Sequence, residues 1–284
     1  MQKSGASDSL GLLNPLSQQK QNEALVRVGD LSRRVNILGV GISPLTLAGA
    51  TQQIASWVEC RSRNYVNVCT VHTVMECQNA PELKRIVNRS GLATPDGMPL
   101  VWLCHYYGEK NVTRVYGPDL LLSVCAHPTG KKYRHFFYGG APGVADALAE
   151  RLKHRFPELI VSGTYSPPML AIGELEEPGT IDLINGSNAD IVWVGLGTPK
   201  QDFWVAHHRT LLNAPVLVAV GAAFDFLTGR IPQAPTWMQR NGLEWLFRLA
   251  KEPRRLAYRY LIYNPLFVLY LLAQISGLRR YPLL

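Results

Sequence analysis

The sequence predicts a doubly wound, Rossmann-like α/β fold, in which a mostly parallel sheet carries helices on both faces. Apolar runs of strand length alternate with segments of helical period along most of the chain, a pattern typical of repeated β-α units. Glycine-rich turns follow several of these runs. The chain has 284 residues, of which 47% are hydrophobic, so it can bury a sizeable core.

The predicted β-α units follow one another from Arg34 onward. Each pairs an apolar run with a following helical segment or turn: VNILGVGI with LAGATQQIASWVECR, YVNVCTV with VMECQNAPELKRIVNRS, HFFYGG with VADALAERLKHRF, ELIVSGTY with the region 173–188, DIVWVGLG with KQDFWVAHHRTLL, and PVLVAVG with the turn 222–229. Ligands of doubly wound sheets bind beyond the carboxyl ends of the strands. We therefore expect the site where VCTV, FFYGG, WVGLG and VAVG end.

The two ends of the chain depart from this pattern. Residues 1–34 are rich in Ser, Gln and Asn without a sustained period, which predicts a mobile leader, and they lack the apolar core and cleavage site of a signal peptide. Residues 35–245 form the predicted α/β domain, and residues 246–284 a basic, apolar appendage. The five cysteines show no zinc-type spacing, which favours buried thiols in the reducing cytoplasm.

The C-terminal appendage combines basic and apolar residues. Residues 248–284 contain seven Arg or Lys and one acid, Glu252, and the stretch from Leu261 to Leu278 is apolar but interrupted by Pro265. Because about 20 apolar residues are needed to span a bilayer, we expect a helix that lies in the membrane interface, with its cations at anionic headgroups. The alternative is an ordinary buried C-terminal helix.

The overall charge favours an acidic partner. The formal net charge is +8, which suits a nucleic acid, an anionic lipid or a phosphorylated substrate and does not choose among them. Three glycine-rich turns could bring backbone amides close to a diphosphate: Gly39-Val-Gly41, Gly139-Gly140 and Gly195-Leu-Gly197. None completes a GxGxxG or Walker A motif, so a plain tight turn explains each of them equally well.

One acid is placed as a general base would be. Asp96 lies between a proline and a glycine in TPDGMP, directly after a short apolar run. A carboxylate held at a strand end can accept the proton of a hydroxyl nucleophile. Asp-Gly taken alone usually marks only a turn.

Seven segments in this order resemble the WecG/TagA/CpsF family, glycosyltransferase family 26, over residues 35–260. They are TPDGMPLVW, RVYGPDL, FFYGGAPGVA, WVGLGTPKQDFW, AVGAAFDFLTG, APTWMQRNGLEWLFRL and EPRRLAYRY. The resemblance implies an inverting hexosyltransferase that moves a sugar from a UDP-sugar to a polyprenyl-diphosphate-linked saccharide. It also implies surface polysaccharide biosynthesis, such as exopolysaccharide or capsule, by a peripheral protein at the cytoplasmic face of the bacterial inner membrane.

The resemblance also assigns roles to individual residues. It makes Asp96 the general base and Thr70 part of a pocket motif, usually Thr-x-Asn, that reads Thr70-Val71-His72 here. Its remaining implied positions are Arg114 and Gln201 as donor contacts, Asp225 as a nucleotide contact, and Arg248, Arg255 and Arg259 as arginines that close over the site, with Arg255 and Arg259 acting in catalysis. The glycine turns, through Gly139, Gly140 and Gly197, would bind the diphosphate. A solvated basic face is the plainer interpretation of the arginines.

The expected reaction needs neither a metal nor another cofactor. The chain has no Asp-x-Asp motif, and arginine can meet the leaving diphosphate instead. The adjacent histidines 207 and 208 do not have the spacing of metal ligands on one helix face. The expected partners are the UDP-sugar, the polyprenyl-diphosphate-linked acceptor and an anionic membrane surface, with no nucleic acid; a homo-oligomer stays open.

Two other functions compete with this one. The first is a non-catalytic membrane adaptor that organises a polysaccharide assembly complex through the basic appendage. The second is a nicotinamide-dependent oxidoreductase, suggested by Gly39-Val-Gly41, although Pro44 stands where the third glycine of that motif belongs.

Overall fold

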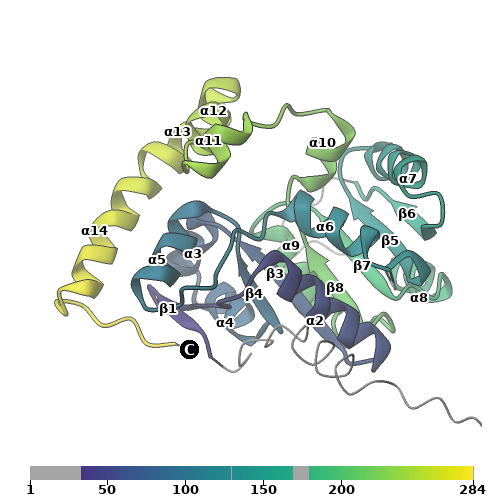
Figure 1. Ribbon diagram of the computed structural model, residues 1–284, viewed down its shortest axis with the longest axis horizontal. Coiled ribbons are helices and arrows are strands. Elements are labelled where there is room, and N and C mark those ends of the chain that lie inside the picture. The colour runs from purple at the N-terminus through teal and green to yellow at the C-terminus, as the bar shows by residue number, and fades with distance from the viewer. Residues whose placement is uncertain (1–32, 129, 169–178, 284) are drawn as a thin grey trace, which may run out of the picture.

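Six parallel strands form one sheet in the order β4-β3-β8-β7-β5-β6. The strands are β3 (Asn64–Cys69), β4 (Leu92–Pro95), β5 (Arg134–Gly139), β6 (Ile160–Tyr165), β7 (Ile191–Gly195) and β8 (Val216–Ala219). This computed structural model describes residues 33–128, 130–168 and 179–283 (Figure 1). The predicted leader therefore lies almost wholly outside the described residues, and the predicted α/β sheet is confirmed.

Helices connect the strands and continue beyond the last one. In the domain they are α2 (Leu47–Glu59), α3 (Val71–Asn79), α4 (Pro81–Arg89), α5 (Met98–Tyr106), α6 (Gly117–Ala126), the 3₁₀ turn η1 (Gly130–Lys132), α7 (Val144–Arg155), α8 (Thr180–Gly186), α9 (Lys200–His208) and α10 (Ala223–Thr228). The C-terminal helices are α11 (Thr236–Arg240), α12 (Glu244–Lys251), α13 (Pro253–Leu261) and α14 (Tyr263–Ile275). Figure 1 shows α11 to α13 above the α3 and α5 end of the sheet.

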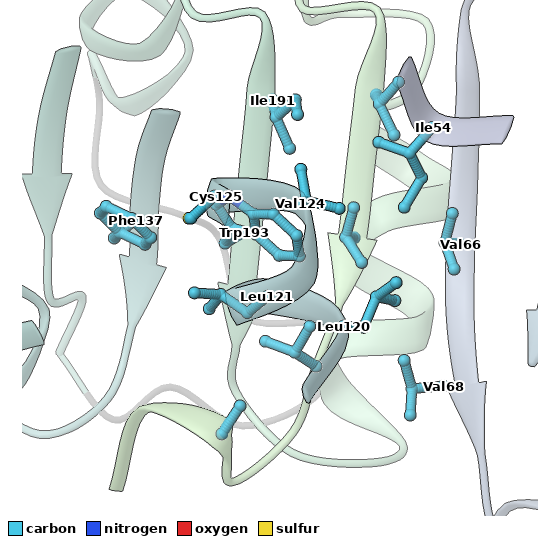
Figure 2. Packing of buried hydrophobic residues seen from close by; sticks show 14 of the residues in the cluster. Ile54, Val66, Val68, Leu120, Leu121, Val124, Cys125, Phe137, Ile191 and Trp193 are labelled. Atoms are coloured by element: carbon cyan, nitrogen blue, oxygen red, sulfur yellow. The ribbon is translucent and has the colours of Figure 1, made fainter. Parts of the chain in front are cut away.

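The sheet is buried on both faces, which explains why its strands are apolar without alternation. Helices α2, α6, α7 and α10 cover one face, where Trp193 and Phe137 pack with Leu121 (Figure 2). Helices α4, α8 and α9 cover the other, where Val192 packs in a second cluster. Neighbours such as Val192 and Trp193 point to opposite faces because side chains alternate along a strand. Each fully buried side chain of this size contributes roughly 1.5–3 kcal/mol.

The first apolar run is not a strand of this sheet. Residues 35–42 form an antiparallel hairpin of β1 (Val35–Ile37) and β2 (Val40–Ile42). Leu38 and Gly39 turn the chain with φ angles of 52° and 79°, as a two-residue type I′ turn requires. A Cβ at Gly39 would lie 2.8 Å from the carbonyl oxygen of Pro282. The predicted first β-α unit is therefore wrong, and its glycines serve a hairpin rather than a nucleotide.

The last helix is docked along one side and exposed along the other. Tyr263 and Phe267 of α14 are buried in the cluster that contains the hairpin and α3. Gln274 joins helix and hairpin: its Nε2 donates to the Asn36 carbonyl at 3.0 Å, and its Oε1 accepts from the Leu38 amide at 2.8 Å. The exposed apolar side chains lie on the other side: Val268, Leu269, Leu272, Ile275 and, just beyond the helix, Leu278. Among the described residues, one segment, Pro253–Ile275, is long and apolar enough to cross a membrane by length and composition.

Candidate active site

A cavity of about 640 Å³ lies beyond the carboxyl ends of β3, β4, β7 and β8, where the fold predicts a ligand. Helices α11 to α14 complete its wall. Nine of the residues predicted for the site line it: Thr70, His72, Asp96, Arg114, Gly197, Gln201, Arg248, Arg255 and Arg259. The fold thus brings together residues that are up to 189 positions apart in the sequence.

Asp96 follows β4 and is held at the cavity wall. Its amide donates to the Cys69 carbonyl at 2.8 Å, and its side chain is 14% exposed. The pKa of Asp96 is raised to about 6, chiefly by burial and in addition by the negative charge of nearby Glu244, against the opposing effect of the Arg114 guanidinium. The carboxylate is therefore ionised at neutral pH yet more basic than an ordinary aspartate, which suits a general base.

Arg114 links Asp96 to the C-terminal helices. Its Nη2 donates to Asp96 Oδ1 at 3.1 Å and to Glu244 Oε2 at 2.6 Å, and its Nη1 donates to Gln239 Oε1 at 3.1 Å. Its Nε donates to the Asp96 carbonyl, and the guanidinium lies 4.0 Å from the centre of the Tyr116 ring. These contacts orient Asp96 and tie α11 and α12 to it.

Glu244 and Gln239 were not predicted for the site. Both lie in APTWMQRNGLEWLFRL, one of the seven segments that carry the family resemblance. The resemblance implied no role for either residue. An ion pair between positions 114 and 244 has no local signal, because it depends on how α12 folds back over the sheet.

Three arginines crowd the roof of the cavity. Arg248 comes from α12, and Arg255 and Arg259 come from α13. Arg255 contacts Glu252 at 2.6 Å, whereas the buried Nε of Arg248 has no hydrogen-bond partner among the described residues. The pKa of Arg259 is lowered by burial and by the nearby Arg248 and Arg255. Such closely placed cations favour a multiply charged anion, and a diphosphate can receive several of their donors.

Thr70 and His72 form the wall at the start of α3. The Thr70 hydroxyl accepts from the Thr73 amide at 3.4 Å and so caps the helix. His72 stacks on Tyr263, with ring centroids 5.7 Å apart. The pKa of His72 is lowered to about 3, chiefly by burial and in addition by the positive charges of Arg259 and Arg248, so the ring is neutral. Its Nδ1 is buried 3.7 Å from Glu76 Oε1, beyond hydrogen-bond distance.

Gln201 holds two loops of the cavity together. The side chain is almost completely buried, and its Oε1 accepts from the Gly197 amide at 3.1 Å and from the Gly221 amide at 2.8 Å. Gly197 has a φ of 78°, which favours glycine. Gln201 therefore shapes the wall between the ends of β7 and β8.

Three predicted residues are not brought to the cavity. Gly139 and Gly140 are used in packing: a Cβ at Gly139 would lie 2.6 Å from the Gly195 carbonyl oxygen, and the Gly140 amide donates to that oxygen at 3.0 Å. Asp225 lies on α10 with its carboxylate 3.8 Å from Arg230. The glycine-rich turn after β5 thus serves the contact between β5 and β7.

Comparison with known proteins places these residues in a family. A family model described as "Glycosyl transferase WecG/TagA/CpsF family" matches residues 35–281. The chain is 32% identical over 180 residues to a protein of Bacillus spizizenii, an alignment that covers 63% of this chain and 68% of the relative. It is 28% identical over 171 residues to a protein of Bacillus subtilis, covering 60% and 64%. Both relatives are named N-acetylglucosaminyldiphosphoundecaprenol N-acetyl-beta-D-mannosaminyltransferase.

Proposed function

Since the chain belongs to the WecG/TagA/CpsF family of glycosyltransferases, we propose that it transfers a hexose unit from a UDP-sugar to a polyprenyl-diphosphate-linked saccharide, with inversion at the anomeric carbon. The observation that carries the proposal is a single cavity with a basic carboxylate, Asp96, in its wall and three arginines in its roof. These are the two charges that such a displacement needs. The relatives' names support a lipid diphosphate acceptor that bears an N-acetylhexosamine.

The proposed reaction uses the Asp96 carboxylate as the base and the three arginines as the cations that stabilise the leaving group. Asp96 takes the proton of the acceptor hydroxyl as that oxygen attacks the anomeric carbon. The bond from that carbon to the diphosphate oxygen breaks, and its electron pair leaves with UDP. Arg248, Arg255 and Arg259 meet the charge that develops on the diphosphate. Attack from the face opposite the leaving group inverts the configuration, and Asp96 later returns its proton to water.

The wider setting follows from the acceptor and from the C-terminal helices. A lipid-linked acceptor stays in the membrane, so the enzyme must work at the membrane surface. The exposed apolar side of α14 and the nearby cations Arg254 and Arg279 support peripheral attachment to an anionic leaflet. The product would be an intermediate of an exopolysaccharide, a capsule or a similar surface polysaccharide.

The rival functions explain less of the site. An adaptor has no need for a buried carboxylate paired with Arg114, or for a buried Arg248 Nε that lacks a hydrogen-bond partner among the described residues, because such desolvation costs stability. The oxidoreductase hypothesis rested on Gly39-Val-Gly41, which forms a hairpin turn away from the cavity.

The test is transfer by the Asp96→Asn variant, measured as UDP release and as lipid-linked product in excess EDTA. We expect the variant to lose roughly 10²–10⁴-fold in rate, the usual contribution of a general base, while UDP binding by calorimetry is retained. Asp119→Asn is the matched control, because Asp119 is an exposed acid near Arg114 that does not line the cavity. Near-normal turnover by Asp96→Asn would refute the assignment, and loss of wild-type activity in EDTA would refute the role given to the arginines.

A further inference from the structure

The cavity has two chemically different ends. Asp96 and the three arginines occupy the polar end. The other end lies between α5 and α14 and is lined mainly by apolar side chains: Met98, Trp102, Leu103, Phe267, Val268 and Leu271. A nucleotide and a hexose are polar over most of their surface, so neither is a good partner for this apolar wall.

The apolar end opens toward the outside of the molecule. Val268 and Trp102 line the cavity and are nevertheless 52% and 49% exposed. From Val268 the exposed apolar side of α14 continues through Leu269 and Leu272. Figure 1 shows α14 running beside α5 along the edge of the molecule. A continuous apolar surface therefore leads from the outer side of α14 into the cavity.

We propose that this end is a lipid subsite, which binds the first isoprenoid units of the acceptor between α5 and α14. The inference rests on the proposed function. Both ends belong to one cavity, so an acceptor whose sugar hydroxyl reaches Asp96 can place its hydrocarbon chain against the apolar wall between α5 and α14. A chain held here keeps its remaining units at the apolar side of α14, where a membrane would receive them.

The subsite makes the enzyme selective for the lipid as well as for the sugar. Burial of apolar surface is favourable by roughly 25 cal/mol per Å², so an acceptor with isoprenoid units binds more tightly than one with the same sugar diphosphate on a methyl group. The advantage belongs to the acceptor alone. The Michaelis constant of the UDP-sugar is therefore expected to be the same with either acceptor.

The experiment compares Leu271→Trp with Leu272→Trp on a short isoprenoid acceptor and on the methyl diphosphate acceptor. Leu271 lines the cavity, whereas Leu272, the next residue of the same helix, is 57% exposed and does not line it. Leu271→Trp should lower kcat/KM about tenfold or more for the isoprenoid acceptor, as expected for displacing one buried apolar group. Leu271→Trp should change kcat/KM for the methyl diphosphate acceptor by less than about twofold. Leu272→Trp should change kcat/KM by less than about twofold for either acceptor.

A second variant guards against misfolding of the first. Val268→Gln changes a half-exposed residue at the mouth and should act in the same direction on the isoprenoid acceptor alone. Equal losses on both acceptors, or equal effects of Leu271→Trp and Leu272→Trp, would overturn the subsite while the proposed function stands. Equal use of both acceptors by the wild type would also overturn it. A wild type that uses neither would refute the proposed function itself, and the subsite with it.

Discussion

Replacement of Glu244 by glutamine should shift the pH dependence of transfer toward lower pH. Asp96 must be ionised to accept a proton, so activity should fall as the pH falls through its pKa, near 6 in this structure. Glu244 raises that pKa by its negative charge, and it also occupies Nη2 of Arg114, which Asp96 shares. Without that charge, Asp96 is the one carboxylate left on Nη2 of Arg114 among the described residues, and it becomes a weaker base.

The size of the shift follows from the geometry of the shared nitrogen. The two carboxylate oxygens lie 3.1 and 2.6 Å from Nη2, so they are at most about 5.7 Å apart. Coulomb's law then gives roughly 0.7 kcal/mol at the dielectric constant of water and roughly 3 kcal/mol at an effective constant of 20. One pKa unit corresponds to about 1.36 kcal/mol. The acidic limb should therefore move down by about 0.5 to 2 pH units.

The assay is kcat/KM for the acceptor from pH 4.5 to 8.5, with Glu252→Gln as control. Glu252 is another acid of the C-terminal helices, but it pairs with Arg255 rather than Arg114, so its replacement should leave the limb in place. Glu244→Asp, which keeps the charge, should restore most of the wild-type profile. A limb that stays unmoved in Glu244→Gln, or moves to higher pH, would show that Glu244 does not set the basicity of Asp96.

Two further predictions concern the cavity wall. His72→Asn should change the ratio of kcat/KM between two UDP-sugars by about fivefold or more, the worth of one hydrogen bond of about 1 kcal/mol, with little change in thermal unfolding; an unchanged ratio would make His72 structural. Gln201→Ala leaves the amides of Gly197 and Gly221 without their acceptor, so urea unfolding should show a loss of roughly 1–4 kcal/mol and calorimetry a weaker affinity for UDP. Gln201→Glu, which keeps an oxygen there, should recover part of both, and wild-type stability of Gln201→Ala would contradict the role.

The strands of the sheet could be predicted because burial on both faces leaves a readable pattern. The run from Ile191 to Gly195 is apolar throughout, as a central parallel strand requires. The run 35–42 is similarly apolar, but it is interrupted by a turn in which Leu38 has a φ of 52°. Leucine rarely adopts a positive φ, so its presence does not predict a turn. The hairpin was therefore hidden from a local interpretation.

In the active site, too, features marked by the local sequence could be predicted, whereas contacts between distant segments could not. Asp96 could be singled out from its place after a strand and the arginines from the family resemblance, and the fold brings them to one cavity. The partners that tune them are remote in sequence, as Glu244 is from Arg114, and only the position of α12 shows them. The glycine-rich turn at Gly139 resembles a phosphate-binding loop in sequence. In the structure, however, Gly139 is required because the backbone packs tightly against the Gly195 carbonyl.

The attachment of α14 to the hairpin also decides how this protein should be prepared in soluble form. Cutting the chain at residue 246 would remove Tyr263 and Phe267 from a buried cluster and leave the Asn36 and Leu38 backbone groups without Gln274. The truncation would remove the exposed apolar side of α14, but it would also expose apolar surface that the helix now covers. The truncated protein is therefore expected to aggregate. Polar substitutions at exposed positions of α14, such as 269, 272 and 275, avoid this. They reduce the affinity for detergent and membrane while every buried contact of the helix stays in place.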